Sequence, residues 1–566
     1  MAWYDEAIFY HIYPLGMTGA PKQNTYEPPV SRLNTLLPWI SHIKELGCNG
    51  LYIGPLFESV GHGYETTDYK KLDSRLGTNE DLTAFVAECH KQGIRVIFDG
   101  VFNHTGRDFF AFRDLLQNRE NSPYKDWYCN VNFYGNNSYN DGFSYENWGG
   151  YDLLAKLNQH NPAVKDYICD VIRFWVKEFD IDGIRLDAAD VMELEYMKAL
   201  RQVANEVKPD FWLMGEVIHG NYSRWANDDT LHSVTNYMLH KALYSGHNDH
   251  NYFEIAHTMK YVGDMTGDRL KLYTFVDNHD VERIYTKLTN KAHFVPVHVM
   301  LYTLPGIPSI YYGSEFGIEG KKERFSDDSL RPALNYEDYK DAITTNLYTK
   351  LIATLGKIRR NTPMLSYGSY KELLLQTTHF AYERSLDGQS VIVTVNNSDY
   401  DVSMQLSCGA FTEYVGALTG TRVQVVDGHL PVIVPANSGE IWLPAELYTG
   451  EDTKNEAIVP IIAPAFVSVE TANKIEPCEE PTIEASLTED PSVKEPPAKL
   501  PTASETPAPA SAPKENKAYE DMSVEELQEA ILEKMRSNGP VTDYMLGTVR
   551  ENVYHDSLVN WVKSFR

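Results

Sequence analysis

Residues 162–207 read PAVKDYICDVIRFWVKEFDIDGIRLDAADVMELEYMKALRQVANEV. Apolar residues at helical spacing predict amphipathic helices over Pro162–Phe179 and Val191–Val207, with a short strand over Gly183–Leu186 between them. A short strand between two such helices is typical of a β/α unit in a parallel sheet. The strand leads directly into Asp187, and Arg185 lies two residues earlier, so both side chains project to the same side.

The same unit repeats over residues 1–365, where β-rich runs alternate with polar loops and helical stretches such as Arg32–Leu46 and Asn79–Gln92. Eight strands in such units predict a closed (β/α)8 barrel, a TIM barrel of the α/β class. The predicted strands are Ala7–Tyr13, Asn49–Ile53, Ile94–Phe98, Gly183–Leu186, Phe211–Met214, Ser233–Asn236, Leu272–Val276 and Ser309–Tyr312.

The third unit carries a long insertion, which we interpret as a small subdomain over about residues 105–158. The insertion is rich in Asn, Tyr, Gly and Trp. Its tryptophans Trp127 and Trp148 either pack in a small core or offer flat platforms for a sugar. The sequence alone does not decide between these two roles.

A different pattern begins at residue 366. Short β-rich runs separated by turns predict an antiparallel β-sandwich over residues 366–446. Its predicted strands are Tyr370–Thr378, Phe380–Arg384, Ser390–Asn396, Asp401–Gln405, Thr421–Val426, His429–Val434 and Ser438–Leu443.

The C-terminal part of the chain predicts a linker and a small module. Residues 447–517 are acidic and Pro-rich, with 11 of the 29 prolines, and we expect a disordered, extended linker. Residues 518–566 regain helical periodicity and predict a small helical module, with Ser523 and Glu526 spaced as a capping box. Such a tail either binds a protein partner, localises the enzyme, mediates self-association or is dispensable.

Composition narrows the class of partner. The chain has 566 residues, a formal net charge of −28 and 12% aromatic residues. A surface this negative repels phosphate backbones and anionic lipid, so we expect neither nucleic acid nor membrane as a partner. The first residues lack the pattern of a secretory signal, and the six cysteines form no CxxC pair, which together predict a cytoplasmic protein with reduced thiols.

Polar residues gather where four predicted strands end, which is where barrel enzymes place their chemistry. They are Asp99, Asn103 and His104 after the third strand, Arg185 and Asp187 after the fourth, Glu216 after the fifth, and Asn278, His279 and Asp280 after the seventh. Several acids at one barrel mouth suit an oxocarbenium-like transition state, and a pair of acids suits glycoside hydrolysis directly.

The sequence also suggests roles for these acids. Arg185 is expected to lower the pKa of Asp187, which marks Asp187 as the nucleophile. Glu216 has no such neighbour in sequence, so it is the better candidate for the protonated acid. His104 and His279 are suited to hydrogen-bond sugar hydroxyls, and Asp280 to clamp two adjacent hydroxyls. His11 and Tyr13, at the end of the first strand, either fill the barrel or support the site residues, and we favour the supporting role.

These four segments resemble the four sequence regions of the alpha-amylase superfamily of glycoside hydrolases, and the resemblance covers about residues 1–446. It implies that Asp187 is the nucleophile, Glu216 the general acid/base and Asp280 a third acid that fixes and distorts the sugar. It also implies that Arg185, His104 and His279 surround the cleaved sugar unit.

Three further segments extend the resemblance. Gly63–Tyr69 is similar to the family segment whose tyrosine stacks under the sugar, which implies this role for Tyr64 and a supporting role for Asp68. Tyr151–Asn158 resembles the fifth region of neopullulanases and cyclomaltodextrinases. In Asp327–Pro332, which resembles the same group, Asp327 and Arg331 are implied to hold the next sugar.

Two departures qualify the resemblance. Typical neopullulanases carry an N-terminal β-domain, whereas here the first predicted strand begins within ten residues of Met1. Endo-acting alpha-amylases follow the nucleophile with Ala-Lys-His, whereas this chain has Ala189-Asp190-Val191, which puts the family's calcium site in doubt. Asn103 matches a calcium-ligand position but is as well suited to hold its own loop. The chemistry itself requires no cofactor, and a structural calcium ion is an optional addition.

The resemblance implies a retaining hydrolase of α-1,4-glucosidic bonds in starch-derived maltooligosaccharides, with an α-glucan as substrate. Two alternatives stay open: a cyclomaltodextrinase or neopullulanase type of hydrolase, or an α-glucan transglycosidase that uses the same covalent intermediate. A non-catalytic binding subunit is a remote alternative, because all three acids are present.

Overall fold

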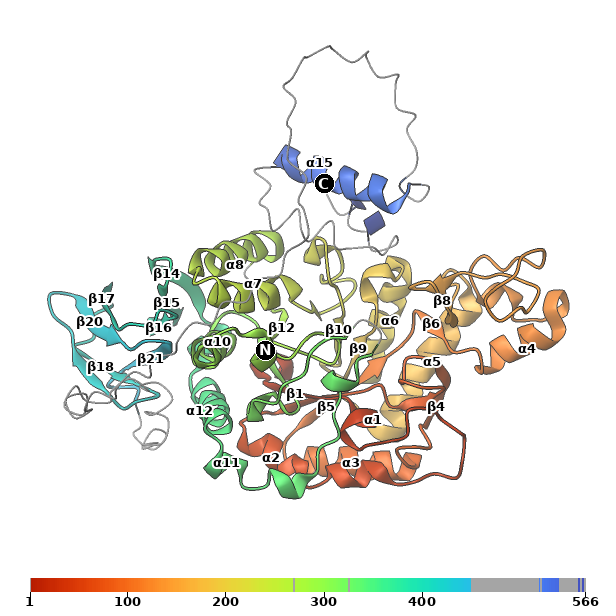
Figure 1. Cartoon of the computed structure of the whole chain (residues 1–566), viewed down its shortest axis with the longest axis horizontal. Coiled ribbons are helices and arrows are strands. Elements are labelled where there is room, and N and C mark those ends of the chain that lie inside the picture. The colour runs from red at the N-terminus through yellow and green to blue at the C-terminus, as the bar shows by residue number, and fades with distance from the viewer. Residues whose placement is uncertain are drawn as a thin grey trace, which may run out of the picture.

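A computed structural model describes residues 2–267, 270–323, 326–448, 519, 522–538, 558–559 and 562–563. At its centre lie eight parallel strands in the order β11-β10-β9-β5-β2-β1-β13-β12 (Figure 1). They are β1 (Phe9–Ile12), β2 (Gly50–Ile53), β5 (Arg95–Gly100), β9 (Gly183–Leu186), β10 (Trp212–Gly215), β11 (Ser233–Val234), β12 (Tyr273–Phe275) and β13 (Ile307–Tyr311). Each overlaps one predicted strand, so the prediction of an eight-stranded barrel is confirmed.

The two outermost strands of this sheet, β11 and β12, meet and close the barrel. Thr235 pairs in parallel with Tyr273, and the N–H of Asn236 donates to the carbonyl of Tyr273 at 2.8 Å. Aromatic side chains fill the interior, where the ring of Trp212 stacks on Phe9 with centroids 5.1 Å apart. The barrel is therefore packed with side chains below the mouth.

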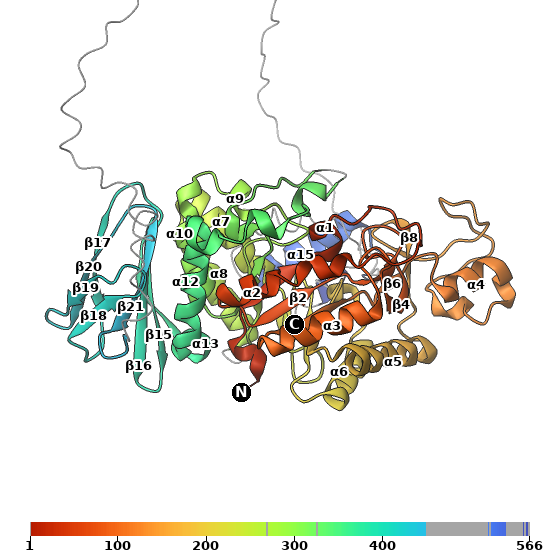
Figure 2. The ribbon, with the colours of Figure 1, turned by 90° about the horizontal axis from the view of Figure 1, so that it is seen from below.

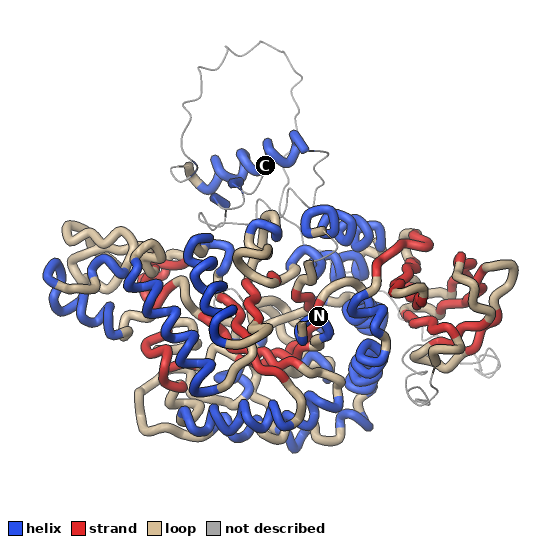
Figure 3. The backbone as a smooth tube through the Cα atoms, turned by 180° about the vertical axis from the view of Figure 1, so that it is seen from behind, coloured by secondary structure: helices blue, strands red, loops and turns tan. Residues whose placement is uncertain are grey.

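Helices surround the barrel, as Figure 3 shows with helices in blue around strands in red. The longer ones are α2 (Trp39–Glu45), α3 (Asn79–Lys91), α5 (Pro162–Phe179), α6 (Leu194–Val207), α7 (Tyr237–Asn248), α8 (Tyr252–Thr266), α10 (Phe294–Thr303) and α12 (Leu347–Asn361). Short helices are α1 (Pro14–Met17), α9 (Ile284–Lys287), α11 (Ala342–Thr345) and α13 (Pro363–Tyr367). The predicted helix Arg32–Leu46 is wrong in its middle, because a 3-10 turn over Arg32–Leu36 ends before Pro38, which caps α2.

The inserted subdomain has its own small sheet. It consists of β6 (His104–Thr105), β7 (Asn147–Trp148) and β8 (Tyr151–Lys156), beside α4 (Phe110–Asn118). Trp127 is buried, and its ring packs edge-on against Tyr124 at 5.1 Å and Phe110 at 5.7 Å, so this tryptophan is a core residue. A hairpin of β3 (Phe57–Ser59) and β4 (Thr66–Leu72), absent from the prediction, joins it near the barrel mouth.

The β-sandwich lies beside the barrel (Figure 1). One sheet has the order β14-β15-β16-β21-β18-β19, and a second sheet pairs β17 with β20. The strands are β14 (Ser369–Leu375), β15 (His379–Leu386), β16 (Gln389–Asn396), β17 (Val402–Ser407), β18 (Glu413–Gly416), β19 (Arg422–Gln424), β20 (His429–Val434) and β21 (Ser438–Pro444). All seven predicted strands are present, and β18 is an additional strand that the prediction missed.

The contact between barrel and sandwich contains a cluster of histidines. The ring centroid of His293 lies 5.7 Å from that of His247 and 5.2 Å from that of His250. The ring of His293 also bonds through Nε2 to the carbonyl of Asn397 in the sandwich at 3.1 Å. His298, in α10, is fully buried. Polar rather than purely apolar contacts therefore join the two parts.

Only part of the C-terminal region is described. Helix α15 (Val524–Asn538) begins as predicted, because the N–H of Glu526 donates to Oγ of Ser523 and the N–H of Ser523 donates to Oε2 of Glu526. Its apolar side chains pack against Leu558, Val559 and Val562. Residues 449–517 of the predicted linker lie outside the described residues, and the domain boundaries stay a prediction.

Candidate active site

The C-terminal ends of neighbouring strands bring the predicted site residues to one end of the barrel. Asp99 lies in β5, Arg185 lies in β9, and Asp187 and Glu216 directly follow β9 and β10. Figure 2 shows α1 and α9, which follow β1 and β12, on the side of the barrel opposite the N-terminus. That side is therefore the barrel mouth.

Arg185 is the centre of this group. Its Nη1 donates to Oδ1 of Asp99 and to Oδ1 of Asp187, both at 2.8 Å. Its Nη2 lies 2.9 Å from Oε2 of Glu216, and the arginine side chain is 3% exposed. Three carboxyl groups from neighbouring strands share one buried guanidinium, and its planar fork fixes where each group lies.

This arrangement corrects the expected electrostatics of Asp187. Burial raises the pKa of Asp187 well above its ordinary value; Arg185 opposes this shift, while Glu216 and Asp99 add to it. Arg185 does lower the pKa of Asp187 as predicted, but burial and the two neighbouring acids outweigh it, so the expectation of a low pKa is wrong. The statement that Glu216 lacks a basic neighbour holds in sequence but is wrong in space, because Arg185 contacts both acids.

Glu216 has two further contacts that the sequence did not suggest. Ala188 adopts a left-handed backbone with φ 48°, and its N–H donates to Oε2 of Glu216 at 3.1 Å. Such a conformation costs roughly 1 kcal/mol for a residue with a side chain. The hydroxyl of Tyr237 donates to Oε1 of Glu216 at 3.3 Å and accepts from Asn278 at 3.1 Å. The backbone after Asp187 thus takes a strained turn that serves Glu216.

Asp99 forms the floor of the site. Its carboxylate accepts from Tyr52 at 2.9 Å and from Tyr64 at 3.1 Å, besides Arg185. A Cβ on Gly54 would lie 2.3 Å from Cβ of Asp99, so glycine is needed for this close approach. The sequence marks Asp99 as part of a strand-end motif without giving it a role, and only its neighbours show that it anchors Arg185 and Tyr64.

A second group of charged residues lies around Asp280. Oδ1 of Asp280 accepts from Nη2 of Arg331 at 2.7 Å, and Oδ2 lies 2.9 Å from Nε2 of His279. The same Arg331 donates to Asp327 at 3.1 Å and, through Nε, to the carbonyl of His279 at 3.0 Å. Although burial raises it, these neighbours hold the pKa of Asp280 well below its ordinary value.

Tyr64 links the two groups. Its hydroxyl bonds to His279 as well as to Asp99, and its ring lies nearly parallel to that of His279 with centroids 5.7 Å apart. His11 stacks on Tyr52 at 4.0 Å and meets His279 edge-on at 5.1 Å. Tyr13 stacks on His279 at 5.9 Å, so the two residues expected to support the site do contact it.

His104 and Asn103 lie at the base of the insertion. Both are buried, and burial lowers the pKa of His104 to about 3. Oδ1 of Asn103 accepts from Gln159 at 3.2 Å, and its Nδ2 lies 3.3 Å from Nδ1 of His104. Among the described residues, no three His, Cys, Asp or Glu side chains are arranged to hold a metal ion. The amide oxygen of Asn103 therefore has a structural use that needs no calcium.

Asp68 does not reach the site. It is exposed in β4, and its carboxylate accepts from the backbone N–H of Lys70 at 2.8 Å. The supporting carboxylate in this segment is Glu65, which is buried and accepts from the N–H of Gly63 at 3.2 Å. The prediction for Asp68 is wrong because Thr66, Tyr69 and Leu72 form the buried face of β4, whereas Asp68 points to solvent.

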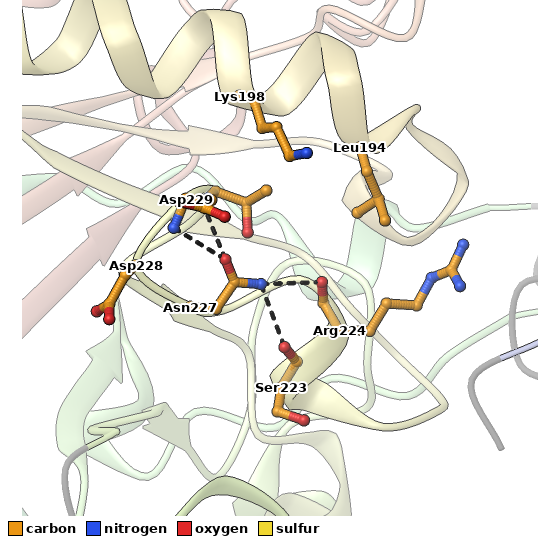
Figure 4. Close-up of a pocket in the computed structure, with 8 residues that line it drawn as sticks. Leu194, Lys198, Ser223, Arg224, Asn227, Asp228 and Asp229 are labelled. Atoms are coloured by element: carbon orange, nitrogen blue, oxygen red, sulfur yellow. Dashed lines mark hydrogen bonds between the residues drawn. The ribbon is translucent and has the colours of Figure 1, made fainter. Parts of the chain in front are cut away.

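A separate surface cavity of about 360 Å³ lies between α6 and the loop after β10 (Figure 4). It is lined by Leu194, Lys198, Ser223, Arg224, Asn227, Asp228, Asp229 and Thr230. The Asn227 side chain bonds to the carbonyls of Ser223 and Arg224 in the same loop, both at 3.2 Å. None of the predicted site residues takes part in it.

A TIM barrel with carboxyl groups gathered on Arg185 at its mouth defines the class of a barrel glycoside hydrolase. Residues 31–348 match the alpha-amylase catalytic domain model, and the chain belongs to this family of glycoside hydrolases.

Similar proteins agree with this assignment. The chain is 32% identical over 419 residues to a cyclomaltodextrinase from Thermoanaerobacter pseudethanolicus, covering 70% of this chain and 71% of the relative. It is 29% identical over 473 residues to neopullulanase 2 from Thermoactinomyces vulgaris, covering 78% of each. The crystal structure of Ttha1563 from Thermus thermophilus aligns with a TM-score of 0.69 at 27% identity, over 78% of this chain and 100% of that one.

Proposed function

We propose that this chain is a retaining α-glucan hydrolase of the cyclomaltodextrinase and neopullulanase type, acting on α-1,4-glucosidic bonds of maltooligosaccharides and cyclodextrins. The observation that carries the proposal is the binding of Asp187 and Glu216 to one guanidinium. Because both carboxyl groups bond to one guanidinium, they lie close to each other. That suits the short separation of roughly 5–5.5 Å that retention requires.

The proposed reaction has two steps. Glu216 gives its proton to the glycosidic oxygen while a carboxylate oxygen of Asp187 attacks C1, so the C1–O bond breaks and a glycosyl ester forms. Glu216, now ionised, then takes a proton from water, and the water oxygen attacks C1 and releases Asp187. The carboxylate of Asp280, kept ionised beside Arg331, accepts hydrogen bonds from hydroxyls of the same sugar.

The remaining residues of the site orient the substrate or other side chains and transfer no proton. Tyr64 is fixed by Asp99 and His279, which suits a ring on which the cleaved sugar stacks. Arg331 contacts Asp280 and Asp327, so we assign it the task of orienting these carboxylates toward the substrate. His104 is buried and interacts with the backbone of Tyr64, and we keep for it the sugar contact that the family resemblance implies.

The test is a time course of products from a maltooligosaccharide ladder and from cyclodextrin, with the anomeric form of the first product followed by NMR. We expect shorter saccharides with the α-configuration retained and no activity in Asp187→Asn. Products longer than the substrate would instead favour the transglycosidase alternative. Inversion, or full activity of Asp187→Asn, would overturn the assignment of Asp187.

For the C-terminal module we propose docking to a protein partner or self-association. Helix α15 packs against Leu558, Val559 and Val562, which supports a small folded unit. Truncation after residue 448 is expected to keep hydrolysis and to change the mass in solution or the captured partner. If the mass in solution and the location in the cell do not change, the C-terminal module is dispensable.

We also propose a cytoplasmic location. Cys48, Cys89, Cys169 and Cys408, in the described part of the chain, are free thiols, which supports a reducing compartment. Among the described helices, none combines the length and hydrophobicity needed to span a bilayer.

A further inference from the structure

Tyr139, in the inserted subdomain, has an exposed ring that is fixed in place by an arginine. The ring of Tyr139 is 49% exposed, and Cζ of Arg107 lies 3.9 Å from its centroid. A guanidinium at this distance covers one face of the ring by a cation–π contact and leaves the other face to solvent. An aromatic face that is both open and fixed is suited to stack on the apolar face of a sugar.

The arginine behind this ring is itself rigid. Nη1 and Nη2 of Arg107 donate to the two carboxylate oxygens of Asp141 at 2.8 and 3.0 Å, and Nη1 also donates to the hydroxyl of Tyr145 at 2.8 Å. Asn137 ties the loop to the same carboxylate at 2.7 Å. Stacking on a ring already fixed in this way costs little conformational entropy.

Arg107, which lies behind the Tyr139 ring, is close in sequence to the candidate active site. Arg107 follows His104 by three residues, so their Cα atoms are at most about 11 Å apart. The N–H of Gly106 donates to the carbonyl of Thr66 at 2.8 Å. The hydroxyl of Tyr26, from the loop after β1, donates to Asp108 at 3.1 Å. These bonds join the Arg107 loop to loops of the barrel mouth.

We propose that Tyr139, backed by Arg107, is an outer stacking site for an α-glucan chain that extends beyond the cleft. In the same loop Nδ2 of Asn136 donates to Oδ1 of Asn140 at 3.2 Å, and each amide group has a further hydrogen that suits a sugar hydroxyl. This inference rests on the proposed function, because it takes the substrate class from there. It adds a reason for the enzyme to prefer long chains over short ones.

The chain offers a matched control for this site. Tyr134 belongs to the same loop and its side chain is fully exposed, at 101% of the reference area, so replacing it changes the same surface without touching the ring fixed on Arg107. Tyr139→Ala and Tyr134→Ala are compared with the unchanged chain on maltotriose and maltoheptaose. We expect Tyr139→Ala to raise KM for maltoheptaose about three- to tenfold, with kcat and maltotriose turnover unchanged. Tyr139→Trp should restore the preference, and Tyr134→Ala should not alter it.

The outcomes separate this inference from the proposed function. If the unchanged chain hydrolyses both substrates and Tyr139→Ala keeps its preference for maltoheptaose, the outer site is refuted while the proposed function stands. If the unchanged chain hydrolyses neither, the proposed function fails, and calorimetric binding of maltoheptaose decides the inference. Weaker binding by Tyr139→Ala than by Tyr134→Ala supports the outer site, and equal binding overturns it.

Discussion

Nη2 of Arg185 lies 2.9 Å from Oε2 of Glu216, although the two residues are 31 positions apart in the sequence. Because Nη1 of the same group bonds Asp187, one planar cation sets the spacing between the proposed acid and the proposed nucleophile. Asp99 holds the arginine from below. The geometry of bond cleavage therefore depends on a residue that neither donates a proton nor attacks the sugar.

Replacing Arg185 by lysine tests this dependence. A lysine keeps the charge but cannot bond three carboxyl groups through a planar fork, so we expect kcat to fall about 100-fold. Arg173→Lys is the matched control, because Arg173 also bonds two carboxylates, Asp170 and Glu206, but is 43% exposed. We require that both variants keep the Tm of the unchanged protein. If kcat of Arg185→Lys then lies within about threefold of that protein, Arg185 does not set the spacing between the two acids.

The leaving group distinguishes the roles of the two acids. Glu216→Gln should lower kcat on maltooligosaccharides roughly 10²–10⁴-fold, because the leaving sugar is no longer protonated. A substrate with an acidic leaving group, such as a nitrophenyl maltoside, should recover most of its first step. Asp187→Asn should be inactive on both substrates. The assignment is reversed if the nitrophenyl substrate rescues Asp187→Asn instead.

The loss of kcat/KM at low pH should report the protonation of Asp187. Its pKa is raised by burial and by Glu216, and the carboxylate must be ionised to attack. We therefore expect kcat/KM to fall, as pH drops, at a pH above the ordinary aspartate range near about 4. In Asp99→Asn this fall should shift to lower pH, because Asp99, a negative neighbour that also raises the pKa of Asp187, is gone.

Arg331→Lys is the control for that experiment. Asp280 has a pKa well below its ordinary value and should stay ionised over the whole pH range measured. Because lysine keeps the positive charge at position 331, the pH at which kcat/KM falls should not change in this variant. A fall at about pH 4 in the unchanged chain, or no shift in Asp99→Asn, contradicts the argument.

The histidines between barrel and sandwich predict acid sensitivity of the fold. Burial lowers the pKa of His247 to about 3 and of His298 to about 4. Both values lie below the unfolded value near 6.5, so stability is complete above that pH and is lost as pH falls toward 4. Between about pH 7.5 and 5 each histidine should cost about 2 kcal/mol, measured by urea unfolding.

A substitution separates these histidines from general acid effects. His298→Asn should lower stability at about pH 7.5, because the Nδ1 bond to the Phe294 carbonyl is lost, but should reduce its dependence on pH. His160→Gln, at a 74% exposed side chain, should change neither. An unchanged pH dependence in His298→Asn would assign the acid sensitivity to other groups.

The barrel could be predicted because its signals are local. Each strand and helix has its own periodicity, so all eight strands were identified and errors fell on short features such as β18 or the break at Pro38. The strand-end acids could be predicted for the same reason, since the carboxyl ends of barrel strands meet at one face.

The electrostatics of the site could not be predicted, because they depend on contacts between distant segments. The residues around Asp187 in sequence do not predict that Asp99 and Glu216 lie beside it. The left-handed backbone at Ala188 could not be predicted either, because this conformation is usually recognised by a glycine. Tyr237 contacts Glu216 from the start of α7, and nothing in the sequence around Tyr237 predicts this contact. The misassigned Asp68 shows the opposite error, in which a motif position faces away from the site.

The three carboxyl groups on Arg185 outnumber its single positive charge. The site is thus short of cationic charge, which the sugar supplies only as C1 becomes electron-poor. A sugar mimic with a basic nitrogen near that position would carry the missing charge permanently. Its capture would favour ionised Asp187 and release protons to the buffer, so its apparent binding enthalpy should vary with the ionisation enthalpy of the buffer. Tight inhibitors of this protein should therefore be sought among amines rather than among neutral sugars.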